Sequence, residues 1–151
     1  MEGNLGVMGV RAINFVKSFR EHHEDCLSGT LNPTAAMSWK PPVIGHVKLN
    51  FDGACLGGKL WGWGFVVRNH DGDIILARAK HGDGFPGALV EEARACLFSL
   101  ENTYNMGIKN ITIEGDCLSL IEMLRSDSVH KNVTGYFVSD ILSFVFIKYF
   151  L

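Results

Sequence analysis

Residues 46–67 combine strict alternation of side chains with closely spaced glycines, and this combination narrows the possible folds more than any other stretch of the sequence. Val47, Leu49 and Phe51 alternate with polar residues, which is the period of a strand with one buried and one polar face. Glycines then interrupt the run, and a second apolar stretch follows. The pattern predicts a β-hairpin in which Asp52 lies on the polar face, where the first strand gives way to the loop. An aspartate at such a place is also a common solvated turn residue.

The hairpin is expected to continue into a third strand. Residues 61–69 are largely apolar, residues 70–73 read His-Asp-Gly-Asp, and residues 74–81 resume a strand pattern. Asp-Gly is a strong turn signal between two strands. The sequence therefore predicts a three-stranded antiparallel meander.

Residues 88–106 change to the period of a helix, which Gly107 ends. At ~100° per residue, Glu91 falls almost opposite the apolar stripe, so we expect its side chain to be solvated. Glu92 falls at the edge of the stripe, so its carboxylate is expected along the border that faces the sheet. An ordinary boundary charge near a helix N-terminus, where the dipole favours carboxylates, would occupy the same position.

Residues 110–114 predict a further strand, and Asp116 closes it on the polar parity. A helix is expected directly afterwards, over residues 117–125, so Asp116 could serve as its N-cap. If this strand lies parallel to the one that carries Asp52, the two aspartates share a face and an end of the sheet. The helix that crosses that face could then bring Glu92 to them.

Three converging carboxylates with no basic partner in their motifs would repel one another in water. The usual reason to tolerate such a cluster is a hard divalent cation, since carboxylate oxygens are the ligands that such cations prefer. Mg²⁺, for which Mn²⁺ can substitute, suits the hydrolysis of phosphodiesters. The sequence thus offers Asp52, Glu92 and Asp116 as a candidate metal site.

Composition limits the size of the fold and its partners. With 151 residues, 47% of them hydrophobic, the chain has enough for one core and is short for two domains. Its net charge of −2 argues against nucleic-acid binding by bulk electrostatics. If three of the 16 acidic residues hold metal, the remaining 13 nearly balance the 14 Lys and Arg residues in charge. Such a neutral remainder is not basic, so any nucleic-acid contact should be modest and sensitive to salt.

The N-terminal part reads as an extension of the domain. Residues 10–26 form a plausible amphipathic helix, and Trp-Lys-Pro-Pro at residues 39–42 cannot continue one. We therefore expect a helical extension over residues 1–38 and an α/β domain over residues 39–151. The sequence has no secretory pattern and no apolar run of the roughly 20 residues that cross a bilayer, so we expect an intracellular, soluble protein without a membrane partner. Four widely spaced cysteines without C-x-x-C fit reduced thiols.

Four motifs follow one another in the order K-L-N-F-D-G-A, G-W-G-F-V-V-R-N-H-D-G-D, E-E-A-R-A-C-L-F-S-L and I-T-I-E-G-D-C-L-S-L-I. Over residues 39–142 the chain resembles the ribonuclease H-like domain of plant retroelement-related proteins. The resemblance implies a ribonuclease H-like mixed sheet, of three antiparallel strands plus one or two parallel ones, with flanking helices. It also implies Mg²⁺-dependent endonucleolytic cleavage of RNA in RNA-DNA hybrids. By motif match, Asp52, Glu92 and Asp116 correspond to the family's first-strand aspartate, helix glutamate and fourth-strand aspartate.

The same resemblance implies a fifth strand and a final helix that carries a fourth acid or a histidine. The sequence stops at Leu151, and Asp140, in the helix expected over residues 135–144, does not match that ligand. Residues 143–151 predict either a short fifth strand or a loose tail. We therefore expect weakened catalysis, and the alternative function is a catalytically inactive module that binds nucleic acid or another partner.

Candidates for substrate contact are few. A hybrid is recognised through phosphates, 2′-hydroxyls and groove shape, which calls for polar and basic side chains beside the acids. Asn50, Lys59 and Arg68 are candidates by proximity, although ordinary solubility charges would look the same. Trp61 and Trp63 share a parity and could stack on bases, but core packing is expected for at least one of them.

Overall fold

The computed structural model describes residues 39–126, 131–144 and 147–150 of the chain. The helix predicted over residues 10–26, like the rest of the expected extension over residues 1–38, lies outside the described residues. Residues 41–151 form one compact unit. Among the helices that the structure describes, none has the length and apolar character needed to cross a membrane.

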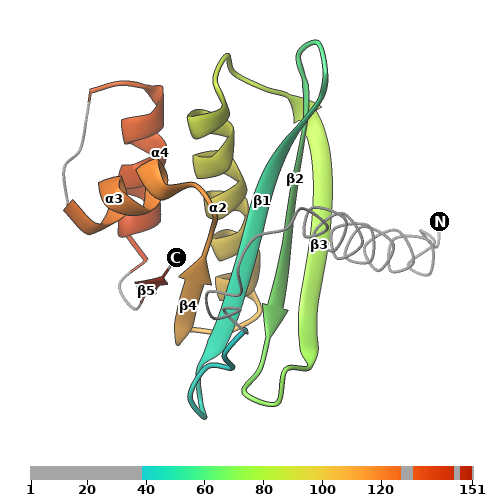
Figure 1. Cartoon of the computed structure of the whole chain (residues 1–151), viewed down its shortest axis with the longest axis vertical. Coiled ribbons are helices and arrows are strands. Elements are labelled where there is room, and N and C mark those ends of the chain that lie inside the picture. The colour runs from blue at the N-terminus through green and yellow to red at the C-terminus, as the bar shows by residue number, and fades with distance from the viewer. Residues whose placement is uncertain (1–38, 127–130, 145–146, 151) are drawn as a thin grey trace, which may run out of the picture. The chain divides into compact units, whose positions relative to one another are not determined.

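One five-stranded mixed sheet organises this unit, with the strand order β3-β2-β1-β4-β5 (Figure 1). Its strands are β1 (Val47–Gly57), β2 (Leu60–Arg68), β3 (Ile74–Asp83), β4 (Ile111–Glu114) and β5 (Ile147–Phe150). Strands β1, β2 and β3 form an antiparallel meander, whereas β4 pairs parallel to β1 and β5 pairs parallel to β4. The predicted mixed sheet with flanking helices is confirmed.

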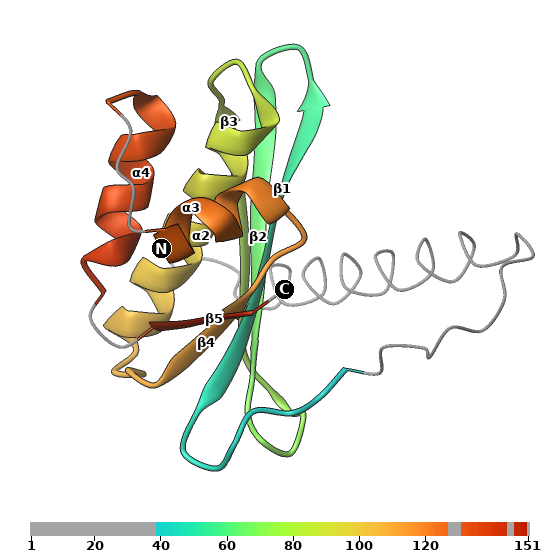
Figure 2. The same ribbon diagram turned by 60° about the vertical axis from the view of Figure 1, so that its left-hand side comes forward.

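The helices are α2 (Ala88–Asn105), α3 (Leu118–Ser126) and α4 (Val133–Leu142). In both views α2 lies between the sheet and α4 (Figures 1 and 2). Alternate residues of the central strands, such as Leu49 and Ile113, are fully buried with Leu100 of α2 in one core. The period of two in β1 thus places its apolar side chains under α2 and leaves Asn50 and Asp52 on the other parity.

Strand β1 is longer than the sequence predicted. It does not end at Asp52 but continues to Gly57, and residues 52–55 stay paired with β2. The sequence of this part shows no alternation of apolar and polar side chains, because most of its residues are small. Backbone hydrogen bonds with the antiparallel strand β2 nevertheless keep it extended. The turn comes at Gly57 and Gly58, whose positive φ angles of 122° and 58° suit residues without a side chain. Asp52 therefore lies within a strand and not at the start of a loop.

The C-terminal residues settle one of the alternatives above. Residues 147–150 form the short fifth strand and pair with the whole of β4, from Ile111 opposite Ile147 to Glu114 opposite Phe150. The helix before it, α4, begins after Asn132, whose side chain accepts a hydrogen bond from the Gly135 backbone N–H at 2.8 Å. An asparagine in this position satisfies one of the unpaired N–H groups of the first turn.

Gly115 follows β4 directly and lies against the buried ring of Phe51. A methyl group at position 115 would lie only 2.5 Å from the Phe51 Cζ atom. We predict that Gly115→Ala lowers the free energy of unfolding by about 1–3 kcal/mol, because the buried Phe51 ring must shift within the core to admit the methyl group. Urea denaturation followed by circular dichroism measures this change.

Gly82→Ala is the matched control. There the added methyl group would lie 3.5 Å from the Trp63 ring, which is ordinary van der Waals contact. Its free energy of unfolding should stay within about 0.5 kcal/mol of the wild-type value. Equal losses in the two variants would contradict a specific clash with Phe51.

Candidate metal centre

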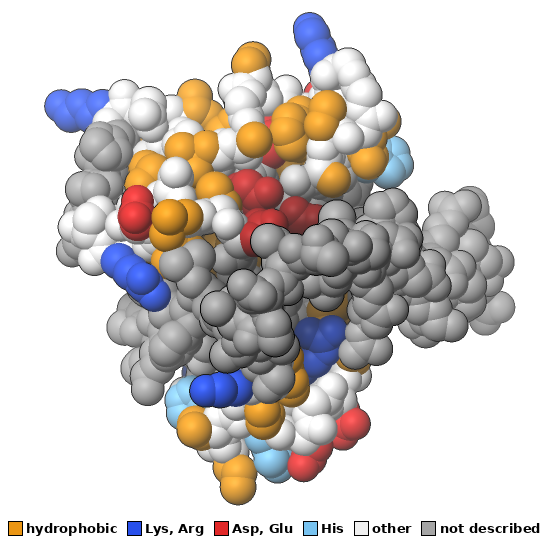
Figure 3. Space-filling model, in the orientation of Figure 1, with side chains coloured by type: hydrophobic (Ala, Val, Ile, Leu, Met, Phe, Trp, Pro, Cys, Tyr) orange, Lys and Arg blue, Asp and Glu red, His pale blue; other side chains and the backbone are white. Residues whose placement is uncertain are grey.

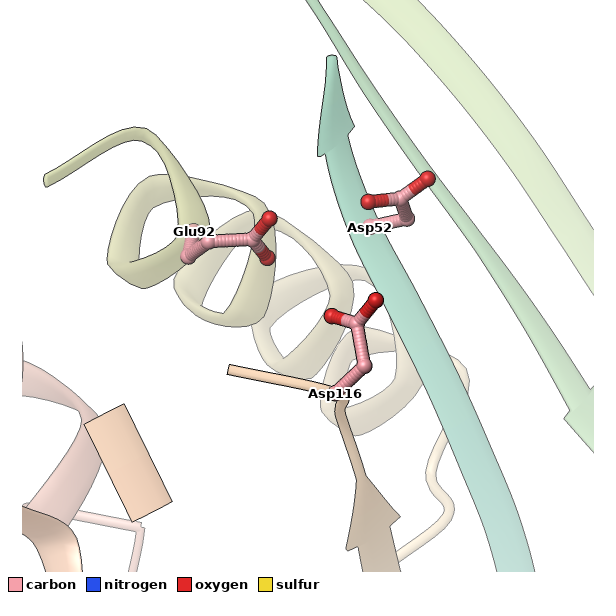
Figure 4. Close-up of side chains that lie close together, drawn as sticks. All are labelled: Asp52, Glu92 and Asp116. Atoms are coloured by element: carbon pink, nitrogen blue, oxygen red, sulfur yellow. The ribbon is translucent and has the colours of Figure 1, made fainter. Parts of the chain in front are cut away.

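Three acidic side chains from distant parts of the sequence meet at one end of the sheet. Asp52 lies on β1, Glu92 lies in the first part of α2, and Asp116 follows β4. One carboxylate oxygen from each lies within 4.8 Å of those of the other two. Figure 4 shows the three carboxylates directed toward a common region from the strand, the helix and the loop. The structure thus brings together all three residues that the sequence singled out.

The parallel register of β1 and β4 explains how the two aspartates come to be neighbours. The last paired residues of the two strands are Asn50 and Glu114, which lie opposite each other. Asp52 and Asp116 each follow two residues later, so both leave the paired region on the same side and at the same end.

The approach of Glu92 depends on a residue without a side chain. A Cβ atom at Gly53 would lie 3.0 Å from the Glu91 carbonyl oxygen and 3.4 Å from the Glu92 nitrogen. The first turns of α2 therefore rest directly on the backbone of β1, beside Asp52. The glycine is needed for this close packing of helix on strand.

The N-cap alternative for Asp116 is not what the structure shows. Helix α3 begins at Leu118, so the residue directly before it is Cys117 and not Asp116. The exposed carboxylate of Asp116 faces Asp52 and Glu92 instead.

Burial and mutual repulsion change the acidity of the cluster. Burial, and then the charges of Asp52 and Asp116, raise the pKa of Glu92 to about 7, against a lowering effect of the Gly53 backbone N–H. Burial, and then the charge of Asp116, also raise the pKa of Asp52. Without a cation, the cluster therefore holds protons more tightly than isolated carboxylates do.

The cluster has the chemistry of a site for a hard cation. Glu92 Oε2 is buried and has no hydrogen-bond partner among the described residues. A buried carboxylate oxygen without a partner is costly, and a bound cation would satisfy it. Because all three side chains offer only oxygen, the set suits Mg²⁺ or Mn²⁺ better than a thiophilic metal. The residues fit the predicted ion.

A separate polar network lies on the same parity of β1 as Asp52. The Asn50 amide donates to Glu114 Oε2 at 3.0 Å, and its oxygen accepts from Arg68 Nη1 at 3.2 Å. Lys48 Nζ lies 2.6 Å from Glu114 Oε1. Of the predicted substrate residues, Asn50 and Arg68 therefore contact each other, and Asn50 lies two residues before Asp52 on β1. Lys59 lies elsewhere, exposed in the β1–β2 turn.

Among the described residues, the side chains beside the acids are mostly hydrophobic and not basic (Figure 3). On the face shown in Figure 3, a central group of acidic side chains is bordered by hydrophobic ones, and the Lys and Arg side chains lie apart from that group.

The two tryptophans differ in exposure. Trp63 is only 3% exposed, within the core, and Trp61 is partly buried against it. The expectation that at least one of them packs in the core is confirmed. Base stacking by Trp63 would require the core to open.

The prediction that Glu91 is solvated is wrong. Glu91 is completely buried and accepts hydrogen bonds from Trp63 Nε1 at 2.8 Å, from the Phe85 backbone N–H and from Arg94 Nη1 at 3.2 Å. The prediction used the positions of residues around a single helix. In the structure, the residues between β3 and α2 cover the side of α2 that carries Glu91. Arg94 at the i+3 position was the one local signal of a partner for this charge.

Comparison with known proteins agrees with this architecture. A family model described as reverse transcriptase-like matches residues 50–145. The comparison with curated proteins found no match.

Several solved structures share the fold at low sequence identity. Ribonuclease H1 from the halophilic archaeon Halobacterium salinarum NRC-1 is 19% identical, with a TM-score of 0.59 over 69% of this chain and 82% of its own. LC11-RNase H1 in complex with an RNA/DNA hybrid is 14% identical, with a TM-score of 0.61 over 69% and 83%. A foamy viral protease-reverse transcriptase, also in complex with an RNA/DNA hybrid, is 14% identical, with a TM-score of 0.56 over 82% of this chain and 19% of its own.

These likenesses show that the sheet and its helices have the ribonuclease H-like fold. The family match covers more than half of the sequence, from the middle of β1 to the residues after α4. The chain therefore belongs to the reverse transcriptase-like family.

Proposed function

We propose that this protein cleaves the RNA strand of RNA-DNA hybrids endonucleolytically, with Mg²⁺ or Mn²⁺ held by Asp52, Glu92 and Asp116. The observation that carries the proposal is the convergence of these three carboxylates within 4.8 Å on a ribonuclease H-like fold. Supporting it, two of the similar structures contain an RNA/DNA hybrid, one of them a ribonuclease H1.

The proposed roles follow from the place of each side chain. Asp52 is held by the backbone pairing of β1, so its carboxylate is a fixed ligand. Asp116 is exposed and lies on the solvent side of the cluster, open to substrate. Glu92 offers its buried Oε2 atom, which accepts no hydrogen bond from the described part of the chain. A divalent cation bound by these oxygens would act as a Lewis acid on the phosphodiester and lower the pKa of the attacking water.

The substrate side of the proposal rests on Asn50 and Arg68. Asn50 lies two residues before Asp52 on the same parity of β1 and accepts a hydrogen bond from Arg68, and both side chains carry N–H groups of the kind that bind phosphates and 2′-hydroxyls. Since the net charge is −2, binding of the hybrid should be modest, and it should be sensitive to salt. Residues 39–151 would make up the catalytic domain and residues 1–38 its N-terminal extension. From the sequence resemblance we also propose an origin in a plant retroelement, and we propose an intracellular location.

The alternative function is a module that binds nucleic acid without cutting it. Both functions use the same fold, so cleavage must be measured directly.

We predict that Asp52→Asn reduces metal-dependent cleavage of a labelled RNA-DNA hybrid at least about 100-fold. The substitution keeps the shape of the side chain but removes the negative charge through which the carboxylate binds a divalent cation. Gel analysis of the cleaved RNA strand with Mg²⁺ or Mn²⁺ measures the rate.

Glu101→Gln is the matched control, because Glu101 is an exposed carboxylate on α2 outside the cluster. Its rate should equal that of the wild type, and single-stranded RNA should not be cut in a metal-dependent way. Binding of the hybrid by a folded wild-type protein that never cuts it would favour the inactive module. Cutting that survives Asp52→Asn would point to a contaminating nuclease or another site.

The raised pKa of Glu92 predicts how stability depends on pH without metal. The folded protein holds this proton up to pH about 7, whereas the ordinary pKa is 4.5. The group therefore favours the folded state below pH 4.5, and this contribution is lost as the pH rises through 7. We expect the Tm of the metal-free protein to fall between pH 5.5 and pH 8, and Glu92→Gln to flatten that fall.

Added Mn²⁺ should have the opposite pH dependence, since ligands bind metal in their deprotonated form. The increase in Tm on adding Mn²⁺ should be larger at pH 8 than at pH 5.5, and smaller in Glu92→Gln at pH 8. Differential scanning calorimetry with and without EDTA measures both effects. An increase independent of pH and of Glu92 would contradict a metal site that includes this carboxylate.

A further inference from the structure

Glu91 is a fully buried charge placed one residue before a proposed metal ligand. Its carboxylate takes no part in the three-carboxylate cluster. Successive helical residues point about 100° apart, so Glu91 and Glu92 leave the helix in different directions. Burial of a charge is costly unless hydrogen bonds and a partner charge compensate it, so the surroundings of Glu91 require an explanation.

The donors to Glu91 come from three parts of the fold. Trp63 Nε1 on β2 donates to Oε2, the Phe85 backbone N–H between β3 and α2 donates to Oε1, and Arg94 Nη1 lies 3.2 Å from both oxygens. The carboxylate thus ties the first turns of α2 to β2 and to the connection that precedes the helix. These contacts form what we call the Glu91 anchor, made of Glu91, Trp63, Phe85 and Arg94.

Arg94 completes the anchor. Its Nη1 also donates to the Asp83 carbonyl at 3.1 Å, and its guanidinium lies 4.3 Å from the Trp63 ring centroid and 5.2 Å from that of Phe85. The positive charge is therefore fixed by stacking as well as by hydrogen bonds. Water would solvate a charge on the exposed side of this helix, whereas the buried Glu91 carboxylate depends on these contacts of Arg94.

The main chain of Glu91 lies against the strand that carries Asp52. Its carbonyl oxygen is the atom that a Cβ at Gly53 would approach to 3.0 Å. The side chain therefore fixes the helix to β2 while the backbone rests on β1. These two contacts fix the start of α2 on the sheet, and so they also fix the distance from the Glu92 carboxylate to Asp52.

We propose that Glu91 is a positioning residue for the metal centre: the Glu91 anchor fixes the start of α2 on the sheet and so sets the place of the Glu92 carboxylate. This inference rests on the proposed function only in that the three acids bind a divalent cation. It does not require that the protein cut a hybrid.

The test is Mn²⁺ binding to the metal-free full chain, measured by electron paramagnetic resonance of free Mn²⁺ without substrate. In Glu91→Gln one acceptor and the charge are lost, while the shape is kept. We expect the dissociation constant for Mn²⁺ to rise about 10-fold or more, as for other groups that orient metal ligands. Excess Mn²⁺ should restore much of any cleavage that this variant loses, whereas a lost ligand such as Asp52 would not be replaced.

Leu100→Ala separates positioning from general loss of stability. Leu100 is fully buried on the same helix, eight residues and about 12 Å along its axis from Glu92. It should lower the Tm while the folded protein binds Mn²⁺ with wild-type affinity. Circular dichroism confirms that each variant is folded at the temperature of the titration.

If Glu91→Gln does not fold, Glu91→Gln/Arg94→Met removes the unpaired charge and keeps an alkyl chain on the Trp63 ring. The same rise in the dissociation constant is expected for it. Wild-type affinity in either folded Glu91 variant, or an equal rise in Leu100→Ala, would overturn the inference, as would a wild-type protein that binds no Mn²⁺. Tight Mn²⁺ binding without hybrid cleavage would instead overturn the proposed function alone.

Discussion

The backbone pairing of β1 with neighbours on both sides is the constraint on which the rest of the molecule depends. Its antiparallel partner β2 keeps residues 52–55 extended, and its parallel partner β4 delivers Asp116 beside Asp52. The apolar side chains on alternate positions of the same strand form part of the core beneath α2. One strand thereby sets both the packing of the domain and two of the three carboxylates.

The third carboxylate is positioned by helix packing, in which two adjacent glutamates have opposite roles. Glu91 is paired with Arg94 and hydrogen-bonded through both oxygens, whereas Glu92 has a buried oxygen for which the described residues supply no partner. The compensated charge belongs to the structure, and the uncompensated one is the group that a cation would satisfy. The cluster opposes folding through repulsion and desolvation, so the close approach of helix and strand over Gly53 must be stabilised elsewhere. The core and the Glu91 anchor can provide that stabilisation.

Local patterns predicted those features that depend on one element at a time. Alternation located the meander, helical spacing located α2, and strand parity put Asp52 and Asp116 on one face. Patterns failed where small residues or a neighbouring element decided the outcome. The glycine-rich half of β1 carries no alternation, so its extended form depends on β2. The environment of Glu91 is made by Trp63 and Phe85, which lie 28 and six residues away in the sequence.

The sequence by itself determined the order of the elements, the three acidic positions and the family resemblance, because all of these follow from periodicity and motif spacing within short segments. Only the tertiary structure decided that the three carboxylates meet, that Glu91 is buried and that residues 147–150 join the sheet as its fifth strand. Those outcomes depend on strand register and on which surfaces pack together. Both are set by contacts between residues far apart in the chain, which no local pattern records.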